Sequence, residues 1–522
     1  MLTRKKIFFL SFTIPAAVRV LFGWIFGTSM FKHFHLVRGL DMETLLRFSE
    51  WGSGADAIPL LTPHRLLLFI NWFCHGKTHV TAPVFIIQAL LGALGCAALA
   101  DLVLTLTGKR RGALAAGIIA ALYLPSLVYE FSILQDSFAM NFTLLAIWGT
   151  SYAWRKNFRL FPAAVSAVLW SLALCGRPTA AVCAAAFALW SIFRMYRKKL
   201  LHRLIFPALV LLTLLAAVST FNFCHGWKFS PFYSSMQYAK TFNSTPRSPQ
   251  ATELQVAKNA IIRSPQLLSA YELRENQNVY FWQRQLPELR ILPAPSELIP
   301  AACAALMILL VSGAWKRKSF YFVAIPLLTL ALPLCFREVI GRYRLLLTPY
   351  FIVAVVMAFY ALKKLRQFKL AAALLTGMIA AGLSIYSAAG KPQVIAEDLH
   401  AWAMAAKNSG TEKKTVFDLY YRYWQHTGFT SAKAFRDFAE CTLELHDPQA
   451  ALTVCRTAMR HNIDPHLVNY YYGMTMVMQN RPEEVAMIYS RINPGRLPPD
   501  LRENYFRICR DTRKILLHKR KN

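Results

Sequence analysis

The chain has 522 residues, of which 55% are hydrophobic and only 16% are charged. A soluble domain is usually about 45–50% apolar and about 25% charged, so the composition excludes an ordinary soluble protein and predicts an all-α, polytopic membrane protein. The net charge is +32, but Lys and Arg form short clusters between apolar runs, which is typical of a topology signal and not of nucleic-acid binding. We therefore expect membrane lipids, and no nucleic acid, among its partners.

The apolar runs predict about eleven membrane spans. Basic residues at 4–6 precede the first span, which indicates a cytoplasmic N-terminus. With this count, most dense basic clusters fall on the cytoplasmic side, whereas Asp41, Asp136, Arg177 and the cluster 337–344 fall on the outer side. The expected spans cover residues 7–27, 81–107, 112–130, 139–154, 160–175, 179–194, 204–223, 297–314, 319–335, 345–362 and 370–388.

The spans predict a membrane domain over residues 1–390, with long outer loops at 28–80 and 224–296. Within the first loop, the apolar stretch 66–73 is too short to span and predicts a surface or re-entrant helix. The second loop is rich in aromatic residues, which either cover a site or anchor the chain at the membrane interface. These residues are Tyr233, Tyr238, Tyr271, Tyr280, Phe281 and Trp282.

The tail 391–522 is polar and predicts a second, soluble helical domain. Its sequence repeats at a period of 34 residues, because Asp447-Pro448 recurs as Arg481-Pro482 and Pro465 recurs as Pro499. This period is typical of tetratricopeptide helix pairs, and the alternative is a plain helical cap with accidental spacing. Helical repeats form concave binding surfaces, so we expect this domain to bind a protein partner, an acceptor or another copy of the chain.

Two carboxylates are expected on the outer face, where they border apolar segments. Acidic residues beside a bilayer are costly unless they have a partner or a function. Asp41 follows the first span, and Asp136 precedes a later one. Either residue could instead cap the helix that follows it. Their return to the same face of the membrane favours a shared functional site.

Arginines on the same face suit a phosphate ligand. Arg337, Arg342 and Arg344 lie where the topology rule does not expect positive charge, and guanidinium groups bind phosphate through paired hydrogen bonds. The alternatives are unspecific binding of lipid headgroups or pairing with Glu338. Arg177 is a further candidate, although Pro178 after it is also typical of a helix start.

These residue types suit group transfer from a lipid-linked sugar phosphate. One carboxylate would take a proton from an acceptor hydroxyl as a general base. Arginines would neutralise the phosphate that leaves. A divalent metal ion could do the same, but two loop acids without a histidine at ligand spacing do not specify one.

Four stretches of residues 1–390 resemble the membrane-embedded C-type glycosyltransferases, in the branch of the protein O-mannosyltransferases and the lipid A aminoarabinose transferases. The chain departs from the family pattern at two places. Met42 separates Asp41 from Glu43, where members often carry adjacent acids. The second acidic site is Asp136, where many members carry Glu. The four stretches are Gly39-Leu40-Asp41, Leu61 to Leu68, Tyr129 to Asp136 with Leu172 to Thr179, and Gly341-Arg342-Tyr343 with Pro349.

The resemblance implies roles for these residues. Asp41 would be the catalytic acid–base residue or a metal ligand, Asp136 the second acidic residue near the sugar or a metal, and Arg342 would contact the donor phosphate. The implied enzyme is an inverting glycosyltransferase that moves a sugar from a polyprenyl-phosphate donor to a protein, lipid or glycan acceptor. Its expected place is the bacterial inner membrane, with the site and the tail on the extracytoplasmic side. The substrate-binding residues expected from these stretches and the outer cluster are Glu43, His64, Arg177, Arg337, Arg342 and Tyr343.

Two other functions remain open from the sequence. A transporter or flippase of lipid-linked saccharides would fit the spans, but such proteins often carry inverted repeats, and no half-to-half repeat is evident here. A membrane scaffold that recruits partners through the tail would not require acids and arginines on one face.

Overall fold

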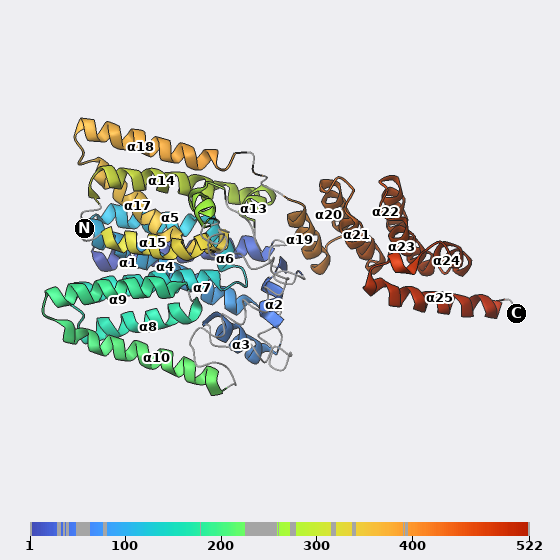
Figure 1. Cartoon of the computed structure of the whole chain (residues 1–522), viewed down its shortest axis with the longest axis horizontal. Coiled ribbons are helices and arrows are strands. Elements are labelled where there is room, and N and C mark those ends of the chain that lie inside the picture. Colours follow the sequence, from blue (N-terminus) through green and yellow to red (C-terminus); the bar gives the residue numbers. More distant parts are fainter. Residues whose placement is uncertain are drawn as a thin grey trace. The chain divides into compact units, whose positions relative to one another are not determined.

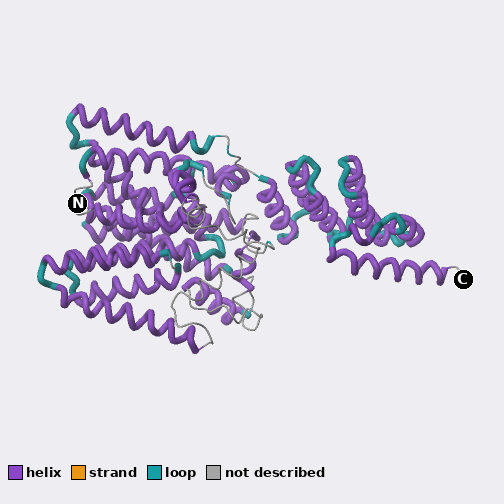
Figure 2. The backbone as a smooth tube through the Cα atoms, viewed as in Figure 1, coloured by secondary structure: helices purple, strands orange, loops and turns teal. Residues whose placement is uncertain are grey.

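The computed structural model describes residues 3–28, 33–34, 37, 41–47, 63–76, 81–177, 179–224, 258, 260–271, 278–314, 320–336, 341–389, 391 and 395–519. Within these ranges the regular structure is helical and contains no strand (Figure 2). The chain divides into two compact units, one formed by Met1–Ser29 with Arg38–Lys391 and the other by Met30–Val37 with Pro392–Asn522. The all-α class predicted from the sequence is therefore confirmed.

A helix forms at every place where the sequence predicts a span, and the long helices of the first unit lie side by side (Figure 1). Apolar runs without local turn signals favour this outcome, because a helix satisfies all of its backbone groups internally. The helices are α1 (Arg4–Thr28), α4 (Ala82–Thr107), α5 (Arg110–Leu122), α6 (Leu124–Glu130), α7 (Asp136–Arg155), α8 (Leu160–Gly176), α9 (Ala180–Arg197), α10 (Ile205–Cys224), α14 (Pro295–Val311), α15 (Tyr321–Phe336), α17 (Thr348–Leu362) and α18 (Gln367–Tyr386).

Not all of these helices qualify as membrane spans by length and composition. Among the described residues 6 do, or up to 7 if α5 and α6, which are bent by 55° at Tyr123, count as one span. The chain is thus a multi-pass membrane protein, and the number of about eleven spans stays a prediction. α8 and α15 are apolar but shorter than the length that a straight span requires.

The core of the first unit lies on α4 and α17. In the most apolar stretch of 18 residues, 61% of the residues are buried in α4 and 78% in the segment Arg342–Leu362, which contains α17. The corresponding share is 17% for α18 and 0% for Leu201–Thr220, which contains most of α10. Apolar helices with so little burial face lipid, so α10 and α18 form part of the lipid-facing surface of the unit.

An ion-pair cluster fixes one end of the unit. Arg4 at the start of α1 contacts Asp101 near the end of α4, with 2.5 Å between Nε and Oδ1. Trp148 of α7 donates its indole N–H to Asp101 Oδ2 at 2.8 Å, and Arg155 lies 3.2 Å from the same oxygen. α7 has 20 residues and is therefore about 30 Å long. Its first residue, Asp136, consequently lies at the opposite end of the unit.

Short helices occupy the loops of the first unit. The apolar stretch 66–73 falls inside α3 (Pro63–His75), as expected for a helix too short to span. In the second loop, α13 (Val279–Gln285) buries Phe281 and Trp282 to 1% and 0% exposure. These two side chains therefore do not anchor the chain at an interface, because they pack inside the protein. Tyr233 and Tyr238 lie outside the described residues.

The second unit is a succession of helices in which each packs against the next. Pro448 and Pro482 each open a helix, and so do Pro465 and Pro499, so the sequence repeat coincides with helix starts, where proline is favoured. Assignment to the tetratricopeptide class stays a prediction. The helices are α19 (Ala396–Asn408), α20 (Lys413–His426), α21 (Ala432–Glu444), α22 (Pro448–Arg460), α23 (Pro465–Met478), α24 (Pro482–Tyr489) and α25 (Pro499–Lys519).

A close approach between α23 and α24 requires glycine at position 473. A Cβ there would lie 2.0 Å from Cε1 of Tyr489. We expect Gly473→Ala to push the two helices apart and to destabilise the second unit by about 1–3 kcal/mol, as overpacked cores do. Hydrogen–deuterium exchange of α23 and α24 in the full-length protein measures this loss. Arg456→Ala, at an exposed position of α22, is the control, and unchanged exchange in Gly473→Ala would contradict the packing.

Candidate active site

Asp41 and Arg342 form the first ion pair of the candidate site. Asp41 is the first residue of α2 (Asp41–Arg47), and Arg342 belongs to α16 (Gly341–Arg344), which leads into α17. Arg342 Nη1 lies 2.5 Å from Asp41 Oδ2, and the two side chains are 12% and 24% exposed. Residues that are 301 positions apart in the chain therefore meet at the start of the buried helix α17, where both side chains are partly exposed.

Asp136 and Arg177 form the second pair, which is more deeply buried. Asp136 opens α7, and Arg177 directly follows α8. Arg177 Nη1 lies 2.5 Å from Asp136 Oδ1, and the exposed fractions of the side chains are 11% and 2%. Burying a carboxylate charge without a paired cation is costly, so Arg177 is a necessary partner of Asp136.

Tyr343 joins the two pairs into one connected set. The Cζ atom of Arg177 lies 4.3 Å from the centroid of the Tyr343 ring, and that of Arg342 lies 5.0 Å from it. Arg342 also donates from Nη2 to the Tyr343 hydroxyl oxygen at 3.2 Å. Both guanidinium groups are thus held by the ring as well as by a carboxylate. We call Asp41, Asp136, Arg177, Arg342 and Tyr343 the carboxylate–arginine cluster.

The cluster combines formal charges that cancel, since it holds two acids and two arginines. Planar guanidinium groups beside a tyrosine ring present several donors in fixed directions. Such donors bind phosphate oxygens, while the carboxylates accept protons or hydrogen bonds from sugar hydroxyl groups. The arrangement therefore brings an anion-binding group and a proton acceptor to the same end of the membrane unit.

The other residues expected in the site either contact groups outside this cluster or have side chains that the structure does not describe. Glu43 and His64 lie in α2 and α3, and their side chains are outside the described residues, as is Arg337 altogether. Arg344 is buried and donates from Nη1 to the carbonyl oxygens of Gln266 at 3.2 Å and Ser269 at 2.6 Å. Arg344 thus secures the loop before α13.

The same loop also binds the end of α18. Ser384 donates to the carbonyl oxygen of Leu268 at 2.5 Å, and Ala270 N–H donates to the carbonyl oxygen of Ser384 at 3.1 Å. Because Arg344 holds this loop beside the start of α17, α18 ends at the end of the unit that carries the carboxylate–arginine cluster.

The carboxylates of the cluster do not form an evident metal site. Among the described residues, no group of three or more His, Cys, Asp or Glu side chains lies close enough to hold an ion. Asp41 and Asp136 are each paired with an arginine, which competes with a cation for the carboxylate oxygens. This donor set does not fit a divalent metal, and we derive no step through one.

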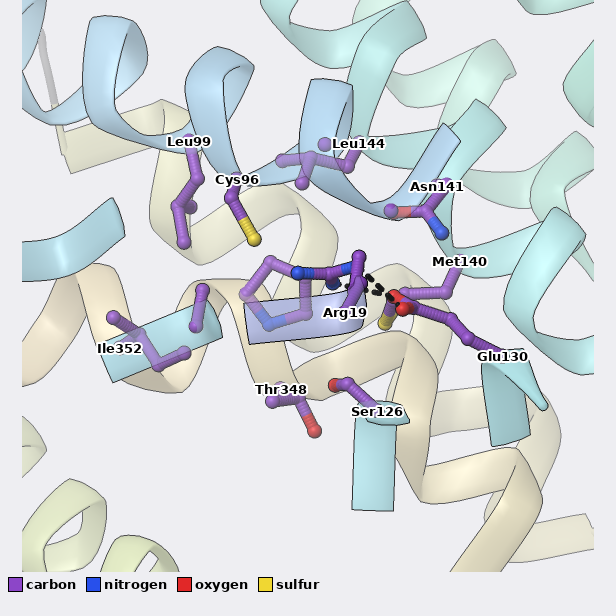
Figure 3. Close-up of a pocket in the computed structure, with 14 residues that line it drawn as sticks. Arg19, Cys96, Leu99, Ser126, Glu130, Met140, Asn141, Leu144, Thr348 and Ile352 are labelled. Carbon is purple, nitrogen blue, oxygen red and sulfur yellow. Dashed lines mark hydrogen bonds and ion pairs between the residues drawn. The ribbon is translucent and has the colours of Figure 1, made fainter. Parts of the chain in front are cut away.

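A third buried pair, Arg19 with Glu130, was not predicted from the sequence (Figure 3). Arg19 lies inside the apolar first helix, and Glu130 ends α6. Charged residues within apolar segments are a functional signal in their own right, so both residues could have been found by that criterion. Their pairing could not, because it joins positions 111 residues apart.

Removal of the arginine should destabilise the protein by a different amount in each pair of the cluster. Arg177→Gln leaves the buried Asp136 carboxylate without a cation, so we expect a loss of about 3–5 kcal/mol, the usual cost of breaking a buried pair. Arg342→Gln should cost less, because Asp41 is more exposed. Thermal unfolding in detergent measures both effects.

The matched double variant is Arg177→Gln with Asp136→Asn, which removes both charges. It should recover part of the stability lost in Arg177→Gln, since no uncompensated charge remains. Equal losses in the Arg177 and Arg342 variants, or a double variant no more stable than Arg177→Gln, would be inconsistent with this geometry.

The region that carries Asp136 and Arg177 is similar to a known protein family. No curated protein and no solved structure matches the chain. A family model does match, over a region that begins in α3 and ends in α10 and thus lies wholly within the membrane unit. The resemblance stated from the sequence is thereby confirmed for this region: residues 67–222 match the dolichyl-phosphate-mannose-protein mannosyltransferase family, whose members are membrane glycosyltransferases of the C type.

Proposed function

We propose that the protein transfers a sugar from a polyprenyl-phosphate donor to an acceptor hydroxyl, at the end of the membrane unit that carries the carboxylate–arginine cluster. The observation that carries the proposal is the link through Tyr343, which brings Asp41, Asp136, Arg177 and Arg342 into one set. The family match supports the class of reaction. The donor, the acceptor and the residue roles are our inference.

Asp41 is the general base in this proposal. Its side chain is more exposed than that of Asp136, 24% against 2%, so an acceptor can reach it. Asp41 takes the proton of the acceptor hydroxyl while the hydroxyl oxygen attacks the anomeric carbon of the sugar. The bond between that carbon and the phosphate oxygen breaks, and polyprenyl phosphate leaves. Attack from the face opposite the phosphate inverts the anomeric configuration.

The two arginines stabilise the phosphate that leaves. Arg342 and Arg177 both contact the Tyr343 ring, and in this proposal one phosphate accepts hydrogen bonds from both. Charge develops on the phosphate oxygen as the bond breaks, and preorganised donors lower the barrier most where charge develops. Asp136 holds Arg177 in place and accepts a hydrogen bond from a hydroxyl group of the sugar. The lipid tail of the donor remains in the bilayer.

The basic clusters support our assignment of the side of the membrane. The end of the unit fixed by Arg4 and Arg155 is also where the basic segments 4–6 and 109–111 lie, next to the ends of α1 and α4. Basic loops favour the cytoplasm, so we place the carboxylate–arginine cluster on the extracytoplasmic side. The chain continues from that end into the second unit, whose helix pairs we propose to be tetratricopeptide-like and to bind an acceptor protein.

Asp41→Asn tests the proposed base directly. We expect it to lower transfer from polyprenyl-phosphate mannose by about 10²–10⁴-fold, the usual contribution of a general base, while the donor still binds. The assay is release of polyprenyl phosphate from labelled donor by the full-length protein in vesicles. Glu288→Gln, which alters an exposed acid of the same unit, is the control and should retain full activity.

Mass spectrometry of lipid that co-purifies with the protein separates the alternatives. An enzyme of the proposed class retains an isoprenoid phosphate or its sugar conjugate. A flippase would bind the donor without cleaving it, and a scaffold would retain neither. Full transfer activity in Asp41→Asn, or wild-type protein that retains no isoprenoid lipid and cleaves no donor, would refute the proposal.

A further inference from the structure

A buried ion pair lies in the middle of the membrane unit, away from the carboxylate–arginine cluster. Arg19 of α1 donates from Nε and Nη2 to the two carboxylate oxygens of Glu130 at 2.6 Å and 2.7 Å, and from Nη1 to the carbonyl oxygen of Pro15 at 3.2 Å. The side chains are 2% and 0% exposed. The two side chains face each other from α1 and α6, with Asn141 beside them (Figure 3).

The pair occupies the start of a buried segment that is not helical. Residues 131–135 connect α6 to α7, and Ile133 and Leu134 within it are 0% and 1% exposed. Irregular backbone at membrane depth is tolerated only where protein groups satisfy its polar atoms. Gln88 of α4 does so by donating from Nε2 to the carbonyl oxygens of Glu130 at 2.5 Å and Ser132 at 3.1 Å.

An aromatic group packs over the same segment. The ring of Phe131 lies 5.2 Å from that of Phe22, 5.3 Å from that of Phe26 and 5.9 Å from that of Phe85. α1 and α4 therefore hold the segment by charge, by hydrogen bonds and by ring packing together. The next residue after the segment is Asp136, the buried acid of the carboxylate–arginine cluster.

The space beside the pair is too small for a substrate. The cavity next to Arg19 and Glu130 has a volume of about 20 Å³, which holds about one water molecule and no sugar. Its lining includes Asn141 of α7 and Thr348 of α17. The pair therefore acts on the site only through the segment that it holds.

We infer that Arg19 and Glu130 are positioning residues that set the place of Asp136 against Arg177. The effect of the pair on turnover rests on the proposed function. Its effect on the position of Asp136 rests on the contacts described above. A reacting group displaced by about 1 Å can cost about 10²-fold in rate. The pair would thus affect turnover strongly and donor binding weakly, because Arg342 and Tyr343 lie on another element.

Two variants disturb the pair in different ways. Gly92→Ala keeps every charge, but its Cβ would lie 2.1 Å from Glu130 Oε1 and must displace the carboxylate. Arg19→Gln with Glu130→Gln removes both charges, so no uncompensated ion remains in the apolar interior. Gly382→Ala, on the lipid-facing α18, meets no atom within 4 Å and is the matched control.

Hydrogen–deuterium exchange of the full-length protein gives a readout that needs no substrate. Residues 131–136 should exchange at least about threefold faster in Gly92→Ala and in the double variant, while Gly382→Ala and the helices at the opposite end remain unchanged. Unchanged exchange in this segment in both variants would overturn the inference, whether or not the protein cleaves polyprenyl-phosphate mannose.

The kinetic readout tests the link to the site. With polyprenyl-phosphate mannose as donor, both variants should lower kcat about 10–100-fold and change KM less than about threefold. A merely structural role would lower the yield of folded protein and leave kcat per folded molecule unchanged, and that result would overturn the inference. If the wild-type protein cleaves no donor, the proposed function fails, and the exchange measurement alone decides whether the pair positions Asp136.

Discussion

The cost of placing a carboxylate in an apolar interior governs the organisation of the membrane unit. Each described acid that is buried there meets an arginine: Asp101 at one end, Glu130 in the middle and Asp136 at the other end. An unpaired ion at these depths would be prohibitive, so each pair fixes which helices must lie together. The three acids lie on α4, α6 and α7, and the arginines reach them from α1, α7 and the end of α8.

This arrangement gives the two ends of the unit different chemistry. At one end, Asp101 is surrounded by two arginines and an indole N–H, which leaves no accessible acid for a reaction. At the other end, Asp41 remains partly exposed and shares its arginine with a tyrosine ring. A donor with its tail in lipid and its phosphate at the surface can approach only such an accessible end. Carboxylate–arginine pairs thus occur at both ends of the unit. The pairs of the buried Asp101 hold helices together, whereas the pair of Asp41 and Arg342 is partly exposed and can meet a ligand.

Much of the helical framework could be predicted from the sequence, because apolar runs bounded by basic clusters leave few alternatives. Asp41, Asp136, Arg177, Arg342 and Tyr343 were also predicted as site residues, from the expected topology and from the family resemblance, and their roles stay a prediction. Their connection through the Tyr343 ring could not be predicted, since it depends on how α7, α8 and α17 pack. The Arg19–Glu130 pair was missed for the same reason, and so was the 55° bend between α5 and α6 that brings Glu130 inward. In the second unit, the prolines of the repeat lie at helix starts, because proline is favoured in the first turn whatever the tertiary fold.

We propose that Arg177 and Arg342 bind one phosphate beside two carboxylates. The most direct measurement is a cryo-electron microscopy map of the full-length protein in nanodiscs that contain a polyprenyl phosphate. We expect phosphate density in contact with both guanidinium groups and next to Tyr343, with the isoprenoid chain leading into the bilayer. Phosphate density at the end of the unit that carries Asp101, or density that contacts neither Arg177 nor Arg342, would contradict it.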